Sequence, residues 1–174
     1  MKDISVSILR YPTDDDWLRC KNLALNTIGK RDAKSVTSEW KTKILKAEHS
    51  PIRTLMFTIQ MDVPYYVSTH FVRHKYGVEH YVTSQRNDRQ NNYDRNKARQ
   101  DVIVSHIMDI NAQALISMAH RRLCNQADNE TQIVMAMIRN EVRKVAPEIA
   151  DQMQAMCQYR GMCYEIHPCY EEQK

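Results

Sequence analysis

Glycine is scarce in this chain, with only three among its 174 residues. Collagen-like repeats, propellers and glycine-rich phosphate loops depend on glycine at close approaches and sharp turns, so these designs are disfavoured and a helix-rich fold is favoured. No apolar run approaches the roughly 18 residues that a membrane span needs. The N-terminal stretch MKDISVSILR lacks the apolar core of a signal peptide, so we expect a cytoplasmic protein with no membrane partner.

A strong excess of charge of one sign is also missing. The formal net charge is +4, with 26% charged and 43% hydrophobic residues, which is the balance of a globular protein and argues against a disordered chain. A charge of this size is too mild to indicate nucleic-acid binding, but it suits a phosphorylated ligand. The length predicts a single domain over residues 1–174, or one compact protomer of an oligomer.

Cysteine occurs five times, and an odd number in a cytoplasmic chain argues against a disulfide framework. The last three are evenly spaced, C-x5-C-x5-C, within a tail that spans residues 157–174. Thiolate and imidazole are ligands that zinc prefers, but a spacing of five exceeds the two to four typical of zinc knuckles. We therefore favour reduced thiols and no metal for the set Cys157, Cys163, Cys169 and His167.

The hydrophobic pattern alternates between two periods along the chain. Alternation of apolar and polar residues predicts strands over 3–9, 53–63 and 79–84. Helical spacing and start signals predict helices over 14–28, 35–47, 64–75, 105–125, 127–145 and 147–156, followed by an irregular tail. This order predicts an α+β fold, in which a small antiparallel sheet packs with several helices.

A polar stretch, residues 86–100, interrupts this pattern and is longer than loops in compact domains usually are. It is either a solvated excursion or a flap over an anionic site. Its single aromatic residue, Tyr93, offers little for base stacking, so nucleic-acid binding is the weakest interpretation. The cations that a flap would bring are Arg86, Arg89, Arg95, Lys97 and Arg99.

The candidate chemistry lies in the hexapeptide H-F-V-R-H-K, which begins at His70. His70, Arg73 and His74 follow i, i+3, i+4 spacing, which places them on one face of the predicted helix. Cationic side chains so placed suit an anion, although a solvated helix end explains them equally well. Ser84-Gln85-Arg86 adds a hydroxyl and a guanidinium suited to phosphate, and Arg122 has no acidic partner at i±3 or i±4.

Two of these segments together resemble a known signature. Arg73-His74-Lys75, eight residues and Ser84-Gln85-Arg86 are similar to the R-H-R, seven or eight residues, Ser pattern of the flavin-dependent thymidylate synthases, the ThyX family. His49-Ser50-Pro51 and Phe57-Thr58-Ile59 resemble the turn and strand that precede this signature in the family. Downstream, Arg122 near a helix end is followed by an alanine and a Glu-containing helix, so the resemblance covers roughly residues 45–145.

The resemblance implies a ThyX-like fold and a specific reaction. The family methylates dUMP to dTMP; methylenetetrahydrofolate supplies the carbon, reduced FAD supplies the hydride and NADPH reduces the flavin. Its members are homotetramers whose sites are shared between subunits. We therefore expect FAD as cofactor, dUMP as substrate and a homotetramer as the assembly.

The resemblance also implies roles for individual residues, position by position. The catalytic residues would be Ser84, Arg86 and His74. The nucleotide would contact His70, Ser84, Gln85, Arg86 and Arg122, with its phosphate between the two arginines. The cofactor would contact His49, Arg73, His74, Lys75 and Gln126.

Several positions depart from the family pattern. Lys75 stands where an arginine is usual, His70 where a glutamine is common and Val82 where many members are acidic, while Arg53-Thr54 replaces a frequent Glu-His pair and Gln126 a frequent histidine. These departures leave two alternatives open. One is a folate-dependent pyrimidine nucleotide hydroxymethylase without flavin redox chemistry, and the other is a catalytically silent nucleotide-binding relative.

Overall fold

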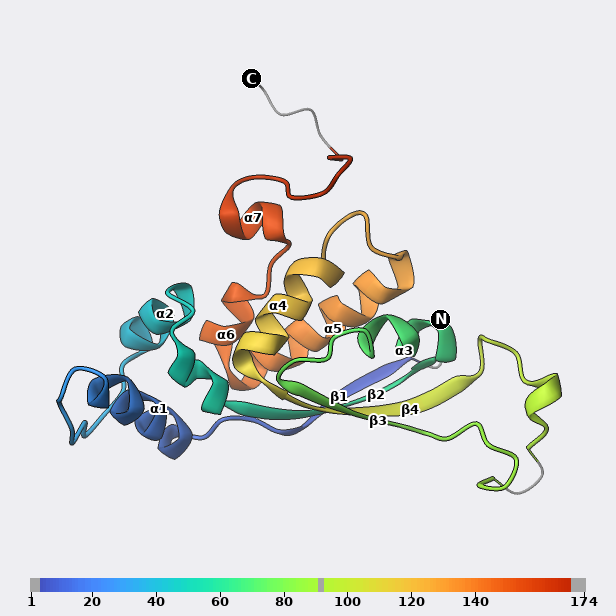
Figure 1. Ribbon diagram of the computed structural model, residues 1–174, viewed down its shortest axis with the longest axis horizontal. Helices are drawn as coiled ribbons and strands as arrows, with labels where there is room; N and C mark the ends of the chain where they lie inside the picture. The colour runs from blue at the N-terminus through green and yellow to red at the C-terminus, as the bar shows by residue number, and fades with distance from the viewer. Residues whose placement is uncertain (1–3, 91–92, 170–174) are drawn as a thin grey trace.

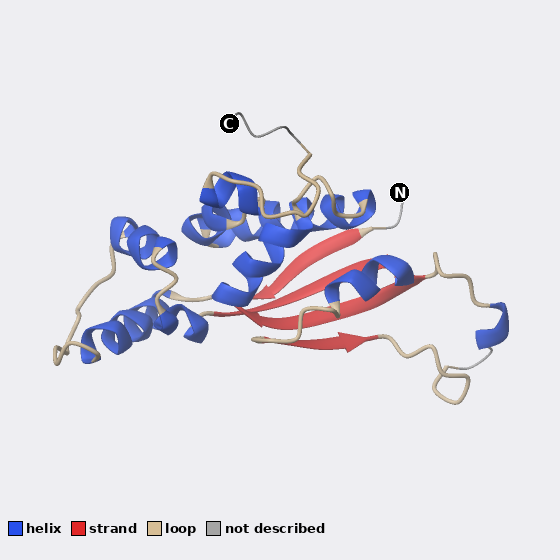
Figure 2. Ribbon diagram, turned by 45° about the horizontal axis from the view of Figure 1, so that its top comes forward, coloured by secondary structure: helices blue, strands red, loops and turns tan. Residues whose placement is uncertain are grey.

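The computed structural model describes residues 4–90 and 93–169, and its centre is one antiparallel sheet (Figures 1 and 2). Within these residues the strand order is β1-β2-β4-β3. The strands are β1 (Ser5–Arg10), β2 (Met56–Pro64), β3 (Val78–Val82) and β4 (Ile103–Asn111). The longest strands, β2 and β4, form the middle of the sheet and pair over their whole length.

Helices cover one face of the sheet, and the α+β class predicted from the sequence is confirmed (Figure 1). Those above the sheet are α3 (Tyr65–Phe71), α4 (Ala112–Arg122), α5 (Asn129–Val145) and α6 (Pro147–Gln152). At one end lie α1 (Asp14–Asn26) and α2 (Ser38–Lys46), and α7 (Met156–Arg160) lies above α4. Short 3-10 turns occupy Ser50–Thr54 and Arg95–Lys97. Within residues 4–90 and 93–169, no helix combines the length and apolarity needed to cross a bilayer.

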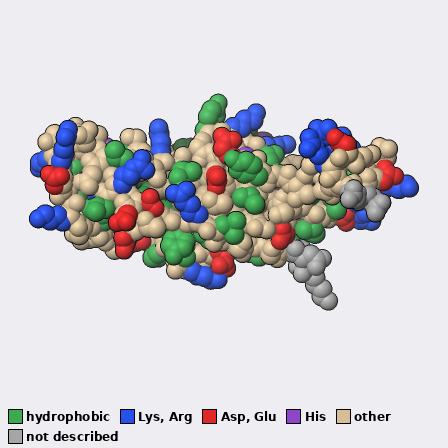
Figure 3. Space-filling model, turned by 90° about the horizontal axis from the view of Figure 1, so that it is seen from below, with side chains coloured by type: hydrophobic (Ala, Val, Ile, Leu, Met, Phe, Trp, Pro, Cys, Tyr) green, Lys and Arg blue, Asp and Glu red, His purple; other side chains and the backbone are tan. Residues whose placement is uncertain are grey.

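Strand β2 shows why the sheet has one dry face. Phe57, Ile59, Met61 and Val63 alternate along it and are fully buried under the helices. The residues between them point to the other face, where Thr58 and its polar neighbours are half-buried. Seen from below, that outer face mixes scattered hydrophobic side chains with polar and charged ones (Figure 3). The predicted strand over 53–63 is confirmed, with its start displaced by the 3-10 turn.

The predicted helix over 105–125 is wrong in its first part, because β4 occupies Ile103–Asn111 before α4 begins. Val104, His106, Met108 and Ile110 alternate into the core, which is the period of a strand. The period changes at Asn111, whose side chain accepts a hydrogen bond from the Ala114 N–H at 2.9 Å and caps α4. This change places the first turn of α4 beside the start of β3.

The predicted helix over 64–75 is too long, since α3 ends at Phe71. Consequently His70, Arg73 and His74 do not share a helix face; the last two lie in the turn that leads to β3. Gly77 ends this turn with a φ of +72°, and its carbonyl accepts a hydrogen bond from the Asn111 N–H at 2.9 Å. A Cβ atom on Gly77 would lie 2.3 Å from the Asn111 side-chain nitrogen, so only glycine fits this close approach.

Two further segments complete the described structure. The connection between β3 and β4, residues 83–102 and hereafter the arm, projects from the end of the sheet and contains the 3-10 turn over Arg95–Lys97 (Figure 1). The tail predicted to be irregular contains α7, so that expectation is wrong for Met156–Arg160. The tail is tied to the body where Tyr159 donates to the Glu48 carboxylate at 3.2 Å.

Candidate functional site

A pocket of about 600 Å³ opens beside the start of β3, between the turn that follows α3 and the first turns of α4. The turn contributes Arg73, His74 and Lys75, which the sequence resemblance assigned to the cofactor, and the structure brings them together here. Tyr76, Gly77, Asn111, Gln113, Ala114 and Ser117 line the rest of the wall with Arg53. Among these lining residues there is no carboxylate, so the wall combines three cations with neutral donors and suits an anionic ligand.

Arg53 is the one cation among the lining residues that the sequence analysis did not assign to the site. It lies in the 3-10 turn before β2, and its Nε donates to the Gln113 side-chain oxygen at 2.5 Å. That bond holds the guanidinium at the pocket wall from the α4 side. Its only signal in the sequence was a basic residue at a position where the family pattern usually has an acidic one.

His74 and Arg122, both half-buried, form one corner of the site. The Arg122 Nε donates to His74 Nε2 at 3.1 Å, and its Nη2 donates to the His70 carbonyl at 2.7 Å. The guanidinium therefore joins the end of α4 to the end of α3. Burial, followed by the charges of Arg73 and Arg121, lowers the pKa of Arg122.

The same contacts fix the protonation of His74. Burial, then the charges of Arg122 and His80, lower its pKa to about 4, so the imidazole is neutral at physiological pH. Because Nε2 accepts from Arg122, the single ring proton resides on Nδ1. His74 at the pocket wall is thus a neutral hydrogen-bond donor rather than a base.

Ser84, Gln85 and Arg86 lie beyond the other end of β3, at the base of the arm. Arg86 makes a bidentate ion pair with Asp88, at 2.9 and 2.7 Å, and this pair lowers the pKa of the Asp88 carboxyl. The Ser84 hydroxyl accepts from the Arg86 N–H at 3.3 Å, and the buried Gln85 Nε2 has no hydrogen-bond partner among the described residues. A five-residue strand spans roughly 17 Å, so one chain does not bring these residues to Arg122.

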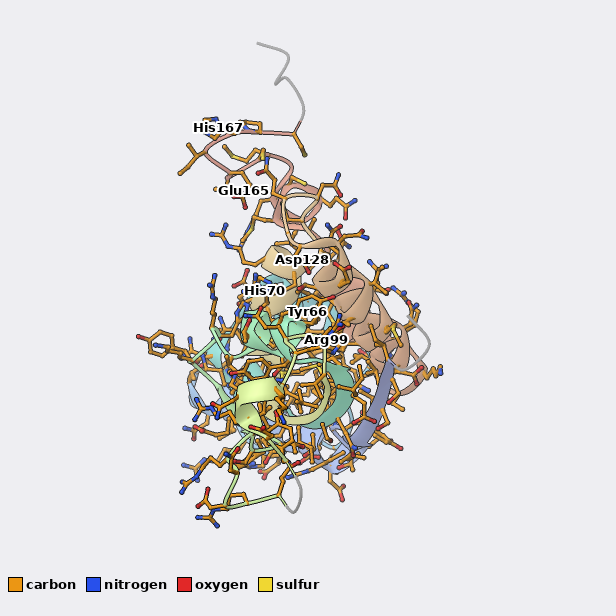
Figure 4. The ribbon with its side chains drawn as sticks, turned by 90° about the vertical axis from the view of Figure 1, so that its right-hand side faces the viewer. Tyr66, His70, Arg99, Asp128, Glu165 and His167 are labelled. Atoms are coloured by element: carbon orange, nitrogen blue, oxygen red, sulfur yellow. The ribbon has the colours of Figure 1, made fainter. Side chains whose placement is uncertain are left out.

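The remaining predicted site residues are dispersed. His70 is half-buried in the last turn of α3, and Figure 4 shows it between Tyr66 and Asp128. His49 is exposed before the 3-10 turn and does not line the pocket. Gln126 is exposed, and its side-chain amide donates to the His167 carbonyl in the tail.

Four of the five cysteines line a second, smaller cavity of about 60 Å³ between α4 and the tail. Burial raises the pKa of the Cys124 thiol, and its sulfur lies 4.0 Å from the Glu165 carboxylate. In Figure 4, Glu165 and His167 lie on the tail, away from His70. Within the part of the chain that the structure describes, no three His, Cys, Asp or Glu side chains are grouped to hold a metal. The four cysteines that line this second cavity are Cys124, Cys157, Cys163 and Cys169.

Comparison with solved structures identifies a known fold. No protein-family model matches the chain, and no curated protein matches its sequence. Among solved structures, the chain shares its fold with a nucleotide-modifying enzyme. That enzyme is the UMP/dUMP methylase PolB from Streptomyces cacaoi, in a crystal structure bound with 5-Br dUMP: the TM-score is 0.65 and the identity 13%, over 86% of this chain and 94% of PolB. The likeness supports the ThyX-like fold expected from the sequence.

Proposed function

We propose that this protein methylates dUMP to dTMP, with methylenetetrahydrofolate as the carbon donor and FAD, reduced by NADPH, as the cofactor. The observation that carries the proposal is the pocket beside β3, where Arg53, Arg73 and Lys75 face one space with no carboxylate among the lining residues. The fold shared with a UMP/dUMP methylase supports a pyrimidine nucleotide as substrate. The signature from Arg73 to Arg86 supports the flavin-dependent form of the reaction.

The donor set of the pocket fits a pyrophosphate cofactor such as FAD. Two guanidinium groups and one ammonium offset the charge of a pyrophosphate, and the Gln113 amide and Ser117 hydroxyl add neutral hydrogen bonds. When bound, FAD supplies hydride transfer at a carbon, which no amino-acid side chain provides. The protein residues bind and orient: Arg53, Arg73 and Lys75 hold the anion, and His74 offers its Nδ1–H to a ligand acceptor.

The separation of Arg86 from Arg122 supports a site shared between subunits. In one chain the two arginines lie near opposite ends of β3, so a single protomer does not offer both to one phosphate. Arg86 lies at the base of the arm and is exposed, which suits a contact with a neighbouring copy. We therefore assign the cofactor pocket to one protomer and the Ser84–Arg86 segment to another within the expected homotetramer.

A UMP methylase is the second candidate, because the structural neighbour is a methylase of both UMP and dUMP. The substrates of the two candidate enzymes differ only in the 2′-hydroxyl of the ribose, which UMP carries and dUMP lacks. They are distinguished by comparing the two nucleotides in the same assay.

The decisive experiment measures release of tritium from C5-labelled dUMP and UMP, with methylenetetrahydrofolate, NADPH and FAD present. We expect a yellow protein, tritium release with all components and restoration of growth in a thymidine-requiring strain. Tritium release without flavin, with a hydroxymethylated product, would establish the hydroxymethylase instead. Tight dUMP binding with no release under any condition would establish a silent nucleotide-binding protein.

The shared site has its own test in mixed oligomers. Subunits carrying Arg86→Ala and subunits carrying Arg73→Ala should each be inactive as homo-oligomers. Their co-expression should restore part of the activity, because some interfaces then combine two intact halves. An absence of recovery in mixed oligomers that bind FAD would place both residues in a site built by one protomer.

A further inference from the structure

Two histidines that the proposed reaction does not use lie under the pocket, on the inner face of the sheet. His106 on β4 is fully buried and His80 on β3 is half-buried. The Ser68 hydroxyl lies 3.0 Å from His106 Nδ1, and His106 Nε2 lies 2.9 Å from His80 Nδ1. The series ends where His80 Nε2 lies 2.8 Å from the backbone carbonyl of His74, in the turn that lines the pocket.

Only one arrangement of protons satisfies all three bonds with neutral rings. A carbonyl can only accept, so His80 Nε2 carries a proton and His80 Nδ1 must accept. His106 Nε2 therefore donates to it, which leaves His106 Nδ1 as an acceptor of the Ser68 hydroxyl. Donation runs in a single direction, from Ser68 through His106 and His80 to the carbonyl of His74.

We infer that Ser68, His106 and His80 form a positioning relay that holds the turn carrying Arg73, His74 and Lys75 in the shape of the pocket. The role of this turn in ligand binding rests on the proposed function. The proton arrangement of the relay does not, because it follows from the hydrogen bonds of the chain itself.

The surroundings argue for positioning rather than simple core filling. The neighbours of His106 on the inner face of β4 are Val104 and Met108, and an apolar residue there would continue the dry face at no cost in buried polar groups. The imidazoles instead reach the His74 carbonyl, which accepts no other hydrogen bond among the described residues. Because α3 has already ended at Phe71, this bond attaches the turn to the sheet.

Neutral rings keep the direction of donation fixed. Burial, then the charge of His80, lower the pKa of His106 to about 4, so it does not take up a second proton near pH 7. A proton added to His80 Nδ1 would face the His106 Nε2–H, and the two donors would oppose each other. The only relief is a shift of the His106 proton to Nδ1, with Ser68 turning from donor to acceptor, a reversal that a hydroxyl allows.

The first test reads the protons directly in the ligand-free protein. Nitrogen-15 NMR of labelled histidine rings at pH 7 should show His80 and His106 as Nε2–H tautomers and His74 as the Nδ1–H tautomer. In His106→Leu, His80 should keep its Nε2–H, because the His74 carbonyl still accepts from it, whereas the resonance of its Nδ1 should shift because that nitrogen has lost its donor. An Nδ1–H tautomer or an imidazolium at His80 in the wild type would overturn the relay.

The second test uses two matched substitutions of His80. Glutamine places an amide nitrogen where Nε2 was and keeps the bond to the His74 carbonyl. Asparagine places its amide where Nδ1 was and keeps only the contact with His106. We expect His80→Asn to weaken FAD binding about fivefold and to speed amide exchange at residues 74–77, whereas His80→Gln stays near wild type, since one neutral hydrogen bond has about this effect.

Equal effects of the two variants, or none from either, would overturn the assignment. Chemical denaturation of both variants controls for a general loss of stability, because each removes one of the two bonds of His80. If the wild type binds no flavin, the proposed function fails, whereas the tautomers and the exchange of residues 74–77 still decide the relay.

Discussion

The two halves of the signature, Arg73–Lys75 and Ser84–Arg86, lie at opposite ends of β3 and have different surroundings. The first half begins a pocket, and its neighbours come from the 3-10 turn before β2 and from β3, β4 and α4. The second half lies at the base of the arm, where Arg86 bonds to Asp88 and the Ser84 carbonyl accepts from Gln90 at 2.7 Å. Among the described residues, the first half is bonded to a distant part of the chain, whereas Ser84 and Arg86 bond to residues close to them in the sequence.

This difference indicates which part of the site is complete in one protomer. Hydrogen bonds from distant elements hold the pocket in shape before any ligand binds. The affinity of the pocket for its ligand should therefore depend little on assembly of the oligomer. Local bonds leave Ser84–Arg86 free to pair with another surface. Removal of a long-range support at the pocket should therefore cost more stability than removal of a side chain in the arm.

The largest expected effect comes from Gly77→Ala, at the junction of the turn and β3. The substitution combines a left-handed backbone, φ +72°, with a Cβ atom 2.3 Å from the Asn111 amide. We expect a loss of roughly 3 kcal/mol in the free energy of unfolding, from strain and overpacking together. Chemical denaturation measures it.

Gly29→Ala is the matched control, because Gly29 has nearly the same φ, +68°, and nothing within 4 Å of an added Cβ. Backbone conformation alone should then cost about 1 kcal/mol. Equal losses in the two variants would mean that the close approach to Asn111 contributes nothing.

Arg122→Ala should have the next largest effect, since it removes charged hydrogen bonds to His74 and to the His70 carbonyl. We expect about 2 kcal/mol lower stability. The pKa of His74 should also rise, because the charge of Arg122 no longer opposes the imidazolium, although burial still lowers it. Ring NMR titration measures the pKa. Arg121→Ala, which removes only an exposed ion pair with Glu165, should cost less than about 1 kcal/mol.

Lowering the pH should reduce the free energy of unfolding gradually, through the buried histidines. His74 and His106 have pKa values of about 4 in the folded protein, mainly because they are buried, against an ordinary value of 6.5. Between these values the unfolded chain binds more protons than the folded one, so stability falls as the pH drops from about 6.5 to about 4. His120, whose pKa burial also lowers, acts in the same direction. Denaturation midpoints at pH 7.5, 6 and 5 that do not change would contradict this expectation.

The smallest effect on stability should follow Arg86→Ala in the arm. Its ion pair with Asp88 is solvent-exposed, so its removal should leave the free energy of unfolding close to that of the wild type. The same substitution should abolish dUMP binding under the proposed function. A large loss of stability would show that the arm supports the fold of its own protomer.

Local patterns in the sequence predicted β2 well but failed at β4, for reasons visible in particular residues. Strand β2 buries an unbroken alternation of apolar side chains, which is a strong signal of period two. In β4 the inward positions include His106, while the half-exposed Ile107 lies between them. A polar residue inside and an apolar one outside reverse the alternation expected of a strand. Ile107 and Ile110 then have the spacing of a helix, so the pattern predicted that the helix starts too early.

The candidate site was predictable in its composition but not in its pairings. The resemblance assigned His74 to the cofactor and Arg122 to the nucleotide, whereas the structure joins them by a hydrogen bond. That bond, like the contact of Gly77 with Asn111, connects elements far apart in the sequence. Local periodicity carries no information on such contacts, so neither the end of α3 nor the protonation of His74 follows from it.

The arm also has a consequence for how fast the chain folds. Val82 and His106 are the paired residues of β3 and β4 that lie nearest in the sequence, and they come together only when residues 83–105, mainly the arm, close into a loop. The entropy of closure grows with the logarithm of loop length, at about 0.6 kcal/mol per doubling, so halving the arm should speed formation of this hairpin about threefold. The length of the arm therefore slows the pairing of β3 with β4, at the sheet edge that carries the pocket. Each further residue in the arm slows this pairing by less than the one before.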